Sequence, residues 1–162
     1  MSRLHWITLP GAGRLATAAR PSADDWLEDE IDTWRAEGVD IVVSLLDAAE
    51  ARELGLQREG ELCRARGMTF VSFPIPDFSL PENEREVARL AGRLVGELKQ
   101  GRSIAIHCRA GIGRSSVIAA CTMISVGIEA ADALARIEAA RGARVPDTEA
   151  QRDWVVAFGK EQ

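Results

Sequence analysis

The chain has 162 residues, enough to bury the core of one domain, and its apolar and charged fractions are ordinary for a globular protein. Its formal net charge of −5 argues against nucleic acid or an anionic membrane as the main partner. Its three cysteines are an odd number without metal-ligand spacing, which indicates neither a disulfide framework nor a zinc site. We therefore expect a reducing, cytoplasmic environment, with no signal peptide and no membrane-spanning stretch.

Strand and helix patterns alternate along the chain. In chain order the expected elements are strands at 5–9 and 14–18, a helix at 22–38, a strand at 40–46, helices at 47–55 and 57–66, a strand at 69–73, a helix at 84–100, a strand at 103–107, and helices at 114–126, 129–142 and 145–158. Strands separated by helices predict a single-domain α/β fold over residues 1–162, with a largely parallel central sheet flanked by helices. Ligands of such sheets bind beyond the carboxyl ends of the strands.

Residues suited to capping mark several of the predicted helix starts. Ser22 can cap the first helix. Asp47 and Glu50 have the spacing of a capping box, in which each side chain bonds the backbone of the other. Asp147 or Thr148 can cap the last helix.

The segment IHCRAGIGRSS, residues 106–116, combines features of an anion-binding loop. The strand before it delivers Cys108 to the edge of the sheet. Gly111 and Gly113 allow backbone geometries that a β-carbon would block, so that successive N–H groups can turn inward. The helix that starts near Arg114 adds its positive N-terminal end, and the guanidinium can hold two oxygens of a phosphate at once.

The same positive surroundings favour the thiolate form of Cys108, which we interpret as a nucleophile that attacks phosphorus. Ser115 can hydrogen bond to the sulfur and stabilise it as a leaving group. The ring of His107 can bond the loop backbone and stiffen it. The alternative is a buried cysteine beside a helix start, which leaves the glycines and Arg114 without a role.

Cys108, Arg114 and Ser115 match the C-x5-R-S/T signature of the cysteine-dependent protein tyrosine phosphatases, and His107 matches the residue before it. The sequence around this signature resembles the compact dual-specificity branch of that family. This resemblance is weaker than that of the loop itself and extends from about residue 39 to 158. The resemblance implies a protein tyrosine phosphatase-like fold and a two-step reaction through a phosphocysteine, without metal or cofactor. It also implies that the loop binds the substrate phosphate through Arg109, Ala110, Gly111, Ile112, Gly113 and Arg114.

A general acid is expected in the segment PIPDFSLP, residues 74–81, which follows a strand and holds three prolines. The resemblance places the acid in such a loop, so Asp77 is the candidate. It would protonate the leaving oxygen and then act as a base toward water. The alternative for Asp77 is a turn-forming aspartate, and the alternative acid is Asp47, whose capping-box pattern already accounts for it.

Gln151 lies in VPDTEAQ, residues 145–151, which resembles the glutamine segment of some tyrosine phosphatases. In that family the glutamine orients the water that hydrolyses the phosphocysteine. The alternative is an exposed glutamine on a helix surface.

The sequence therefore predicts a phosphatase that acts on a phosphorylated protein, with phosphotyrosine favoured, and we expect a monomer. Within the same class the alternative is a phosphoinositide phosphatase, and outside it the alternatives are a non-catalytic phosphate-binding module and a sulfurtransferase. Inositol-lipid phosphatases often carry lysines in the loop, whereas Arg109 is the one additional cation here. A binding module would lack the cysteine, the arginine or the acid, and a sulfurtransferase gives no role to Asp77 and Gln151.

Overall fold

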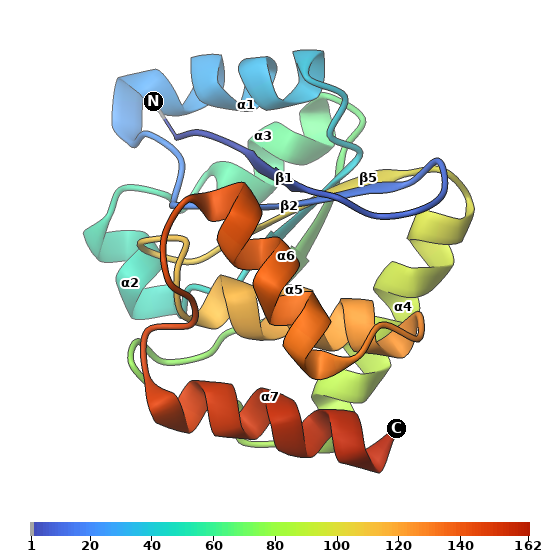
Figure 1. The fold of residues 1–162 in the computed structure, drawn as a ribbon. Helices are drawn as coiled ribbons and strands as arrows, with labels where there is room; N and C mark the ends of the chain where they lie inside the picture. Colours follow the sequence, from blue (N-terminus) through green and yellow to red (C-terminus); the bar gives the residue numbers. More distant parts are fainter. Residues whose placement is uncertain (1) are drawn as a thin grey trace.

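The computed structural model describes residues 2–162, which form a five-stranded sheet with helices on both faces (Figure 1). The strands lie in the order β1-β2-β5-β3-β4. Only β1 is antiparallel to its neighbour; the other three pairings are parallel. The strands are β1 (His5–Ile7), β2 (Arg14–Ala18), β3 (Ile41–Ser44), β4 (Thr69–Ser72) and β5 (Ser103–His107).

The helices form two layers. In Figure 1, α1 and α3 lie above the sheet, and α4 to α7 lie below it. The helices are α1 (Leu27–Ala36), preceded by the 3-10 turn η1 (Asp24–Trp26), then α2 (Ala48–Glu53), α3 (Glu59–Ala65), α4 (Glu84–Lys99), α5 (Arg114–Ser125), α6 (Ala130–Arg141) and α7 (Glu149–Glu161).

Alternating side chains of the strands supply a separate apolar core to each layer. Successive residues of a strand point to opposite faces, so Ile104 and Ile106 pack below the sheet, whereas Ala105 packs above it. The lower core surrounds α5, which is buried along its whole length except at Ser125. The upper core is built around the fully buried Trp34 of α1. Because α5 is enclosed in this way, its first residue, Arg114, has a fixed position near the edge of the sheet.

The predicted α/β fold with a largely parallel sheet is confirmed. The capping box of Asp47 and Glu50 is present at the start of α2, and Thr148 rather than Asp147 caps α7. The predicted cap at Ser22 is wrong, because α1 begins at Leu27 without a side-chain cap. The Ser22 hydroxyl instead donates to the buried carboxylate of Glu30, 2.7 Å away. A buried carboxylate without a hydrogen-bond donor costs more free energy than a helix start without a side-chain cap.

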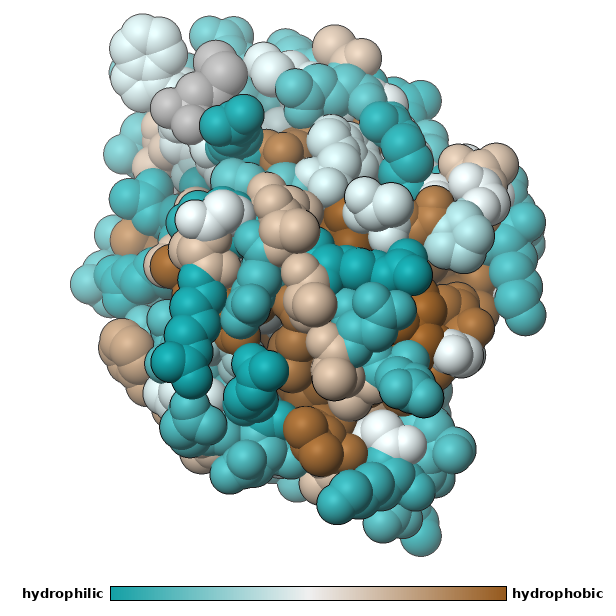
Figure 2. Space-filling model, viewed as in Figure 1, coloured by the Kyte–Doolittle hydropathy of each residue, from teal (hydrophilic) through white to brown (hydrophobic). Residues whose placement is uncertain are grey.

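On the face seen in Figure 2 most side chains are hydrophilic, and hydrophobic ones show mainly near the centre and on the right. Among the described helices, none is long and apolar enough to cross a membrane.

Candidate active site

Cys108 lies directly beyond β5, the central strand of the five-stranded sheet. The preceding residue, His107, pairs with Ala18 of β2 on one side and with Ser44 of β3 on the other. The carboxyl ends of these three strands therefore meet at one edge, and the chain leaves β5 there to enter the loop before α5. This is the edge at which parallel sheets bind their ligands.

The loop folds back over the sulfur of Cys108. The backbone N–H of Gly111 donates to Sγ at 3.3 Å, and the hydroxyl oxygen of Ser115 lies 3.3 Å from the same sulfur. Gly111 has φ +75°, and a β-carbon there would come within 2.6 Å of the Ala18 backbone, so only glycine fits. No side chain caps the start of α5 at Gly113, which leaves its first N–H groups for an anion.

His107 joins the loop to a second buried carboxylate. Its Nε2 lies 2.6 Å from Oε2 of Glu59, and its Nδ1 lies 3.3 Å from the carbonyl oxygen of Cys108. A carbonyl oxygen can only accept, so Nδ1 is the donor of that contact. Both side chains are almost wholly buried, and Trp34 packs against the ring with centroids 6.0 Å apart. The ring is thereby fixed at both nitrogens beneath the loop.

The guanidinium of Arg114 is held by the carboxylate of Glu50. Nη1 donates to Oε1 at 2.7 Å and to the Ile75 carbonyl at 2.7 Å, and Nη2 donates to Oε2 at 3.0 Å. Within residues 2–162 these bonds use three of its five N–H donors. The Nε–H and one Nη2–H remain, and together they form the edge with which a guanidinium binds two oxygens of a phosphate.

Charges around Arg114 reinforce its cationic state. Burial by itself disfavours the charged guanidinium, but the hydrogen bonds from Glu50 and the charges of Cys108, Glu50 and Asp77 outweigh it and raise the pKa of Arg114. The guanidinium is therefore a stable cation in the site.

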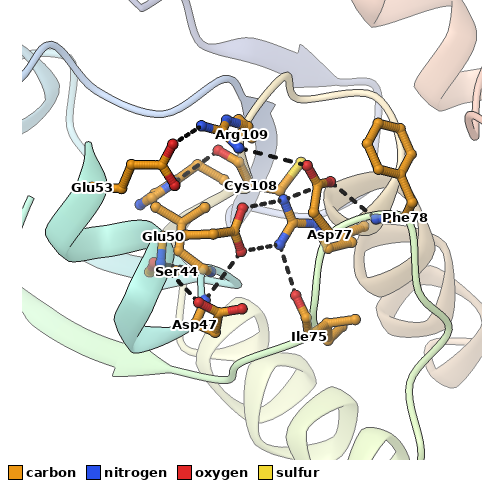
Figure 3. Close-up of polar contacts among 12 residues, drawn as sticks. Ser44, Asp47, Glu50, Glu53, Ile75, Asp77, Phe78, Cys108 and Arg109 are labelled. Atoms are coloured by element: carbon orange, nitrogen blue, oxygen red, sulfur yellow. Dashed lines mark hydrogen bonds and ion pairs between the residues drawn. The ribbon is translucent and has the colours of Figure 1, made fainter.

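Asp77 reaches the site from the loop after β4. Its Oδ1 lies 3.0 Å from Nη2 of Arg114 and accepts a 3.0 Å bond from the N–H of Phe78. Its Oδ2 lies 3.9 Å from Arg109, which also pairs with Glu53 at 3.5 Å. Figure 3 shows the resulting alternation of carboxylates and arginines across the site. Asp77 thus stands beside the guanidinium edge to which a phosphate would bind.

A cavity of about 130 Å³ opens above Cys108. Its lining comes from the loop, from the segment after β4 and from the start of α7: Asp77, Phe78, Cys108, Arg109, Ala110, Gly113, Arg114, Asp147 and Gln151. Gln151 is 2% exposed, and its Oε1 accepts from the Thr148 N–H, so it is not a surface glutamine. Among the described residues, no cluster of metal-ligating side chains occurs here or elsewhere.

The structure brings the predicted site residues together. Of the predicted phosphate-binding positions, Gly111 and Ile112 do not line the cavity, and Gly111 contributes through its amide contact with the sulfur. Asp47, the alternative acid, lies outside the cavity and bonds the Glu50 backbone. Sequence reasoning missed Glu50 and Glu59 as partners of the loop. Glu50 was visible only through its capping-box spacing, and no pattern singled out Glu59.

Comparisons with known proteins agree with this geometry. The family model described as "Polymorphic toxin system, DSP-PTPase phosphatase" matches residues 16–128, which include the loop and end before α6 and α7. A comparison with curated protein sequences finds no significant match.

Solved structures share the whole fold. A kinase-associated phosphatase with serine in place of its catalytic cysteine aligns with a TM-score of 0.88 and 20% identity, over 98% of this chain and 94% of that chain. Tk-PTP in its active form aligns with a TM-score of 0.76 and 25% identity, over 98% and 97%. Human DUSP28 aligns with a TM-score of 0.67 and 13% identity, over 96% and 93%. By its matching family model and its fold, the chain belongs to the dual-specificity protein tyrosine phosphatases described from polymorphic toxin systems.

Proposed function

We propose that the protein is a metal-free phosphomonoester hydrolase that acts through a phosphocysteine on Cys108. The observation that carries the proposal is the geometry around the sulfur. Sγ lies between the Gly111 amide and the Ser115 hydroxyl, and it lines the same cavity as Arg114, whose edge beside Glu50 is contacted by Asp77. These donors suit a thiolate that receives a phosphoryl group while its oxygens are bound by the loop.

In the first step the thiolate attacks phosphorus, and the bond to the leaving oxygen breaks. Arg114 binds two phosphoryl oxygens through its Nε–H and Nη2–H, which displaces Asp77 from the guanidinium. Once released from the guanidinium, Asp77 takes up a proton from solvent and transfers it to the leaving oxygen as general acid. The second step is attack of water on the phosphocysteine, with Asp77 able to receive a water proton and Gln151 to orient the water.

Phosphotyrosine is the proposed substrate group. Phe78 stands at the mouth of the cavity with 77% of its surface exposed, where its ring can pack against that of a phosphotyrosine (Figure 3). A second candidate is a phosphoinositide, because the structure of PTPMT1 in complex with PI(5)P shares the fold at a TM-score of 0.74. The free, buried state of all three cysteines fits the reducing cytoplasm that we propose as the protein's location.

The test is a panel of phosphotyrosine, phosphoserine and phosphothreonine peptides and phosphoinositides, each assayed with EDTA and with vanadate. We expect phosphotyrosine turnover that survives EDTA and is lost with vanadate. Cys108→Ser should bind the phosphopeptide without releasing phosphate. Phosphate release by Cys108→Ser would refute the nucleophile, and faster turnover of phosphoinositides would favour the second candidate.

A further inference from the structure

The cavity above Cys108 contains a carboxylate that the proposed reaction does not use. Asp147, just before α7, lines it together with Asp77 and Gln151. Among residues 2–162, no hydrogen bond or ion pair engages the Asp147 side chain. The cavity's other charged side chains are all paired: Asp77 with Arg114, Arg114 with Glu50, and Arg109 with Glu53. Asp147 is exposed to solvent, and an unpaired carboxylate at the mouth of an anion site weakens the binding of the substrate phosphate.

Asp147 and Gln151 converge on the same point of the loop. A β-carbon on Gly113 would lie 2.5 Å from Oδ2 of Asp147 and 3.0 Å from Nε2 of Gln151. The two polar groups are therefore neighbours that cover the last residue before α5. The capping box fixes their spacing, because Thr148 accepts from the Gln151 N–H and Oε1 of Gln151 accepts from the Thr148 N–H. That box leaves the two Nε2 protons of Gln151 for another acceptor.

These two groups together suit a water molecule. Nε2 of Gln151 can donate to the water oxygen, and the carboxylate of Asp147 can accept one of its protons. Resting on the function proposed above, we propose that Asp147 is a second general base, which shares with Asp77 the activation of the hydrolytic water. The competing explanation is that Asp147 only favours the positive start of α7, as acidic residues before a helix commonly do.

In this step the water oxygen bonds to phosphorus as the bond from phosphorus to Sγ of Cys108 breaks, and that electron pair returns to the sulfur as thiolate. One water proton passes to the Asp147 carboxylate, and inorganic phosphate leaves. The Gly111 amide and the Ser115 hydroxyl receive the thiolate again. In the structure Asp77 is engaged by Arg114, whereas Asp147 needs no partner to be displaced before it accepts the proton.

The experiment compares Asp147→Asn, Asp147→Glu and Asp77→Asn by rapid-quench kinetics with p-nitrophenyl phosphate. For Asp147→Asn we expect an unchanged rate of phosphocysteine formation and hydrolysis slowed by at least about 10-fold, so that a burst of p-nitrophenol approaches the enzyme concentration. Asp147→Glu should restore hydrolysis in part. In the double variant with Asp77→Asn, hydrolysis should be slower than in either single variant.

Glu149→Gln is the matched control. It also removes one negative charge at the start of α7, but Glu149 pairs with Arg144 and does not line the cavity, so hydrolysis should be unchanged. Hydrolysis at the wild-type rate in Asp147→Asn would overturn the inference, and so would equal slowing in the control. If the wild-type protein forms no phosphocysteine at all, the proposed function fails instead, which the same experiment distinguishes.

Discussion

Glu50 has two structural roles, because it binds Arg114 and also takes part in the capping box of α2. Its carboxylate binds both terminal nitrogens of Arg114, and its Oε1 also accepts from the Asp47 N–H, 3.3 Å away, to close the capping box of α2. The pair is buried: the Glu50 side chain is 9% exposed and that of Arg114 is 2% exposed. The orientation of the phosphate-binding arginine is therefore coupled to the start of a short helix on the other side of the site.

Glu50→Gln should destabilise the fold and make it more dependent on a bound anion. Breaking a buried ion pair typically costs about 3 kcal/mol, because the remaining charge is left uncompensated. With Glu50 neutral, a bound oxyanion supplies the missing countercharge, so inorganic phosphate should raise the melting temperature more in the variant than in the wild type. Thermal unfolding with and without phosphate measures both effects.

Glu53→Gln is the control, because Glu53 lies one turn further along α2 and pairs with Arg109 at the surface. An exposed pair contributes about 0–1 kcal/mol, so this variant should melt close to the wild type. A phosphate-induced shift no larger in Glu50→Gln than in wild type would contradict the countercharge role.

At the scale of elements, the site depends on how β5 passes into α5. The strand is central and fully buried, and the helix is enclosed on all sides, so both ends of the loop are held rigidly. The loop itself folds within the space left by β2, whose end at Ala18 lies against Gly111. The N–H of Arg20 donates to the carbonyl of Arg109 at 3.2 Å and fastens the loop to the chain beyond β2.

Gly111→Ala should abolish activity while the protein still folds. At φ +75° an alanine costs about 1–2 kcal/mol, and its β-carbon would also meet the backbone after β2 at 2.6 Å. The loop must move to relieve this contact, which takes the Gly111 amide away from the sulfur of Cys108. Phosphatase activity and thermal unfolding, measured together, separate loss of the site from loss of the fold.

Gly127→Ala tests whether backbone strain alone accounts for that loss. Gly127 ends α5 with φ +100°, and nothing lies within 4 Å of the position that its β-carbon would take. Gly127→Ala therefore carries the cost of a positive φ but no steric clash, and it lies at the opposite end of α5 from the loop. It should lower stability and leave turnover unchanged. Equal activity in the two variants would show that the loop tolerates the displacement at Gly111.

Features that depend on residues close together in the sequence could be predicted, whereas contacts between residues far apart in the sequence could not. Apolar runs and capping residues are local signals, so the strands, the helices, the capping box at Asp47 and a cap at Asp147 or Thr148 could be predicted. The loop signature is also contiguous, which is why Cys108 and Arg114 could be placed. Glu59 meets His107 across 48 residues, and only the fold brings them together. The cap predicted at Ser22 is absent because its hydroxyl donates to Glu30, which lies eight residues further along the chain and outside the range of a capping pattern.

At the scale of the whole molecule, each layer contains a buried thiol away from the site. Cys63 belongs to the core above the sheet and Cys121 to the core below it. Burial raises the pKa of the Cys63 thiol from its ordinary value of 9.0 to about 12, and the nearby charge of Glu59 adds to the effect. Burial likewise raises the pKa of Cys121. Both thiols are therefore protonated in the folded protein under conditions in which the unfolded chain would ionise them.

These buried thiols should make the fold sensitive to alkali. A raised pKa stabilises the folded state fully below the unfolded value, and this contribution is lost as the pH rises from about 9 toward 12. Each such thiol should lower the free energy of unfolding by about 1.4 kcal/mol per pH unit in that window.

Cys63→Ala isolates one of these contributions. Alanine removes the titrating group, and all other residues are the same in both proteins, so their contributions cancel in the difference. Urea unfolding of wild type and variant at several pH values between 8 and 11, with reductant present, measures that difference. It should change by about 1.4 kcal/mol per pH unit above pH 9, in the direction that favours the variant. A difference that stays constant with pH would mean that Cys63 ionises as readily in the folded protein as in the unfolded chain.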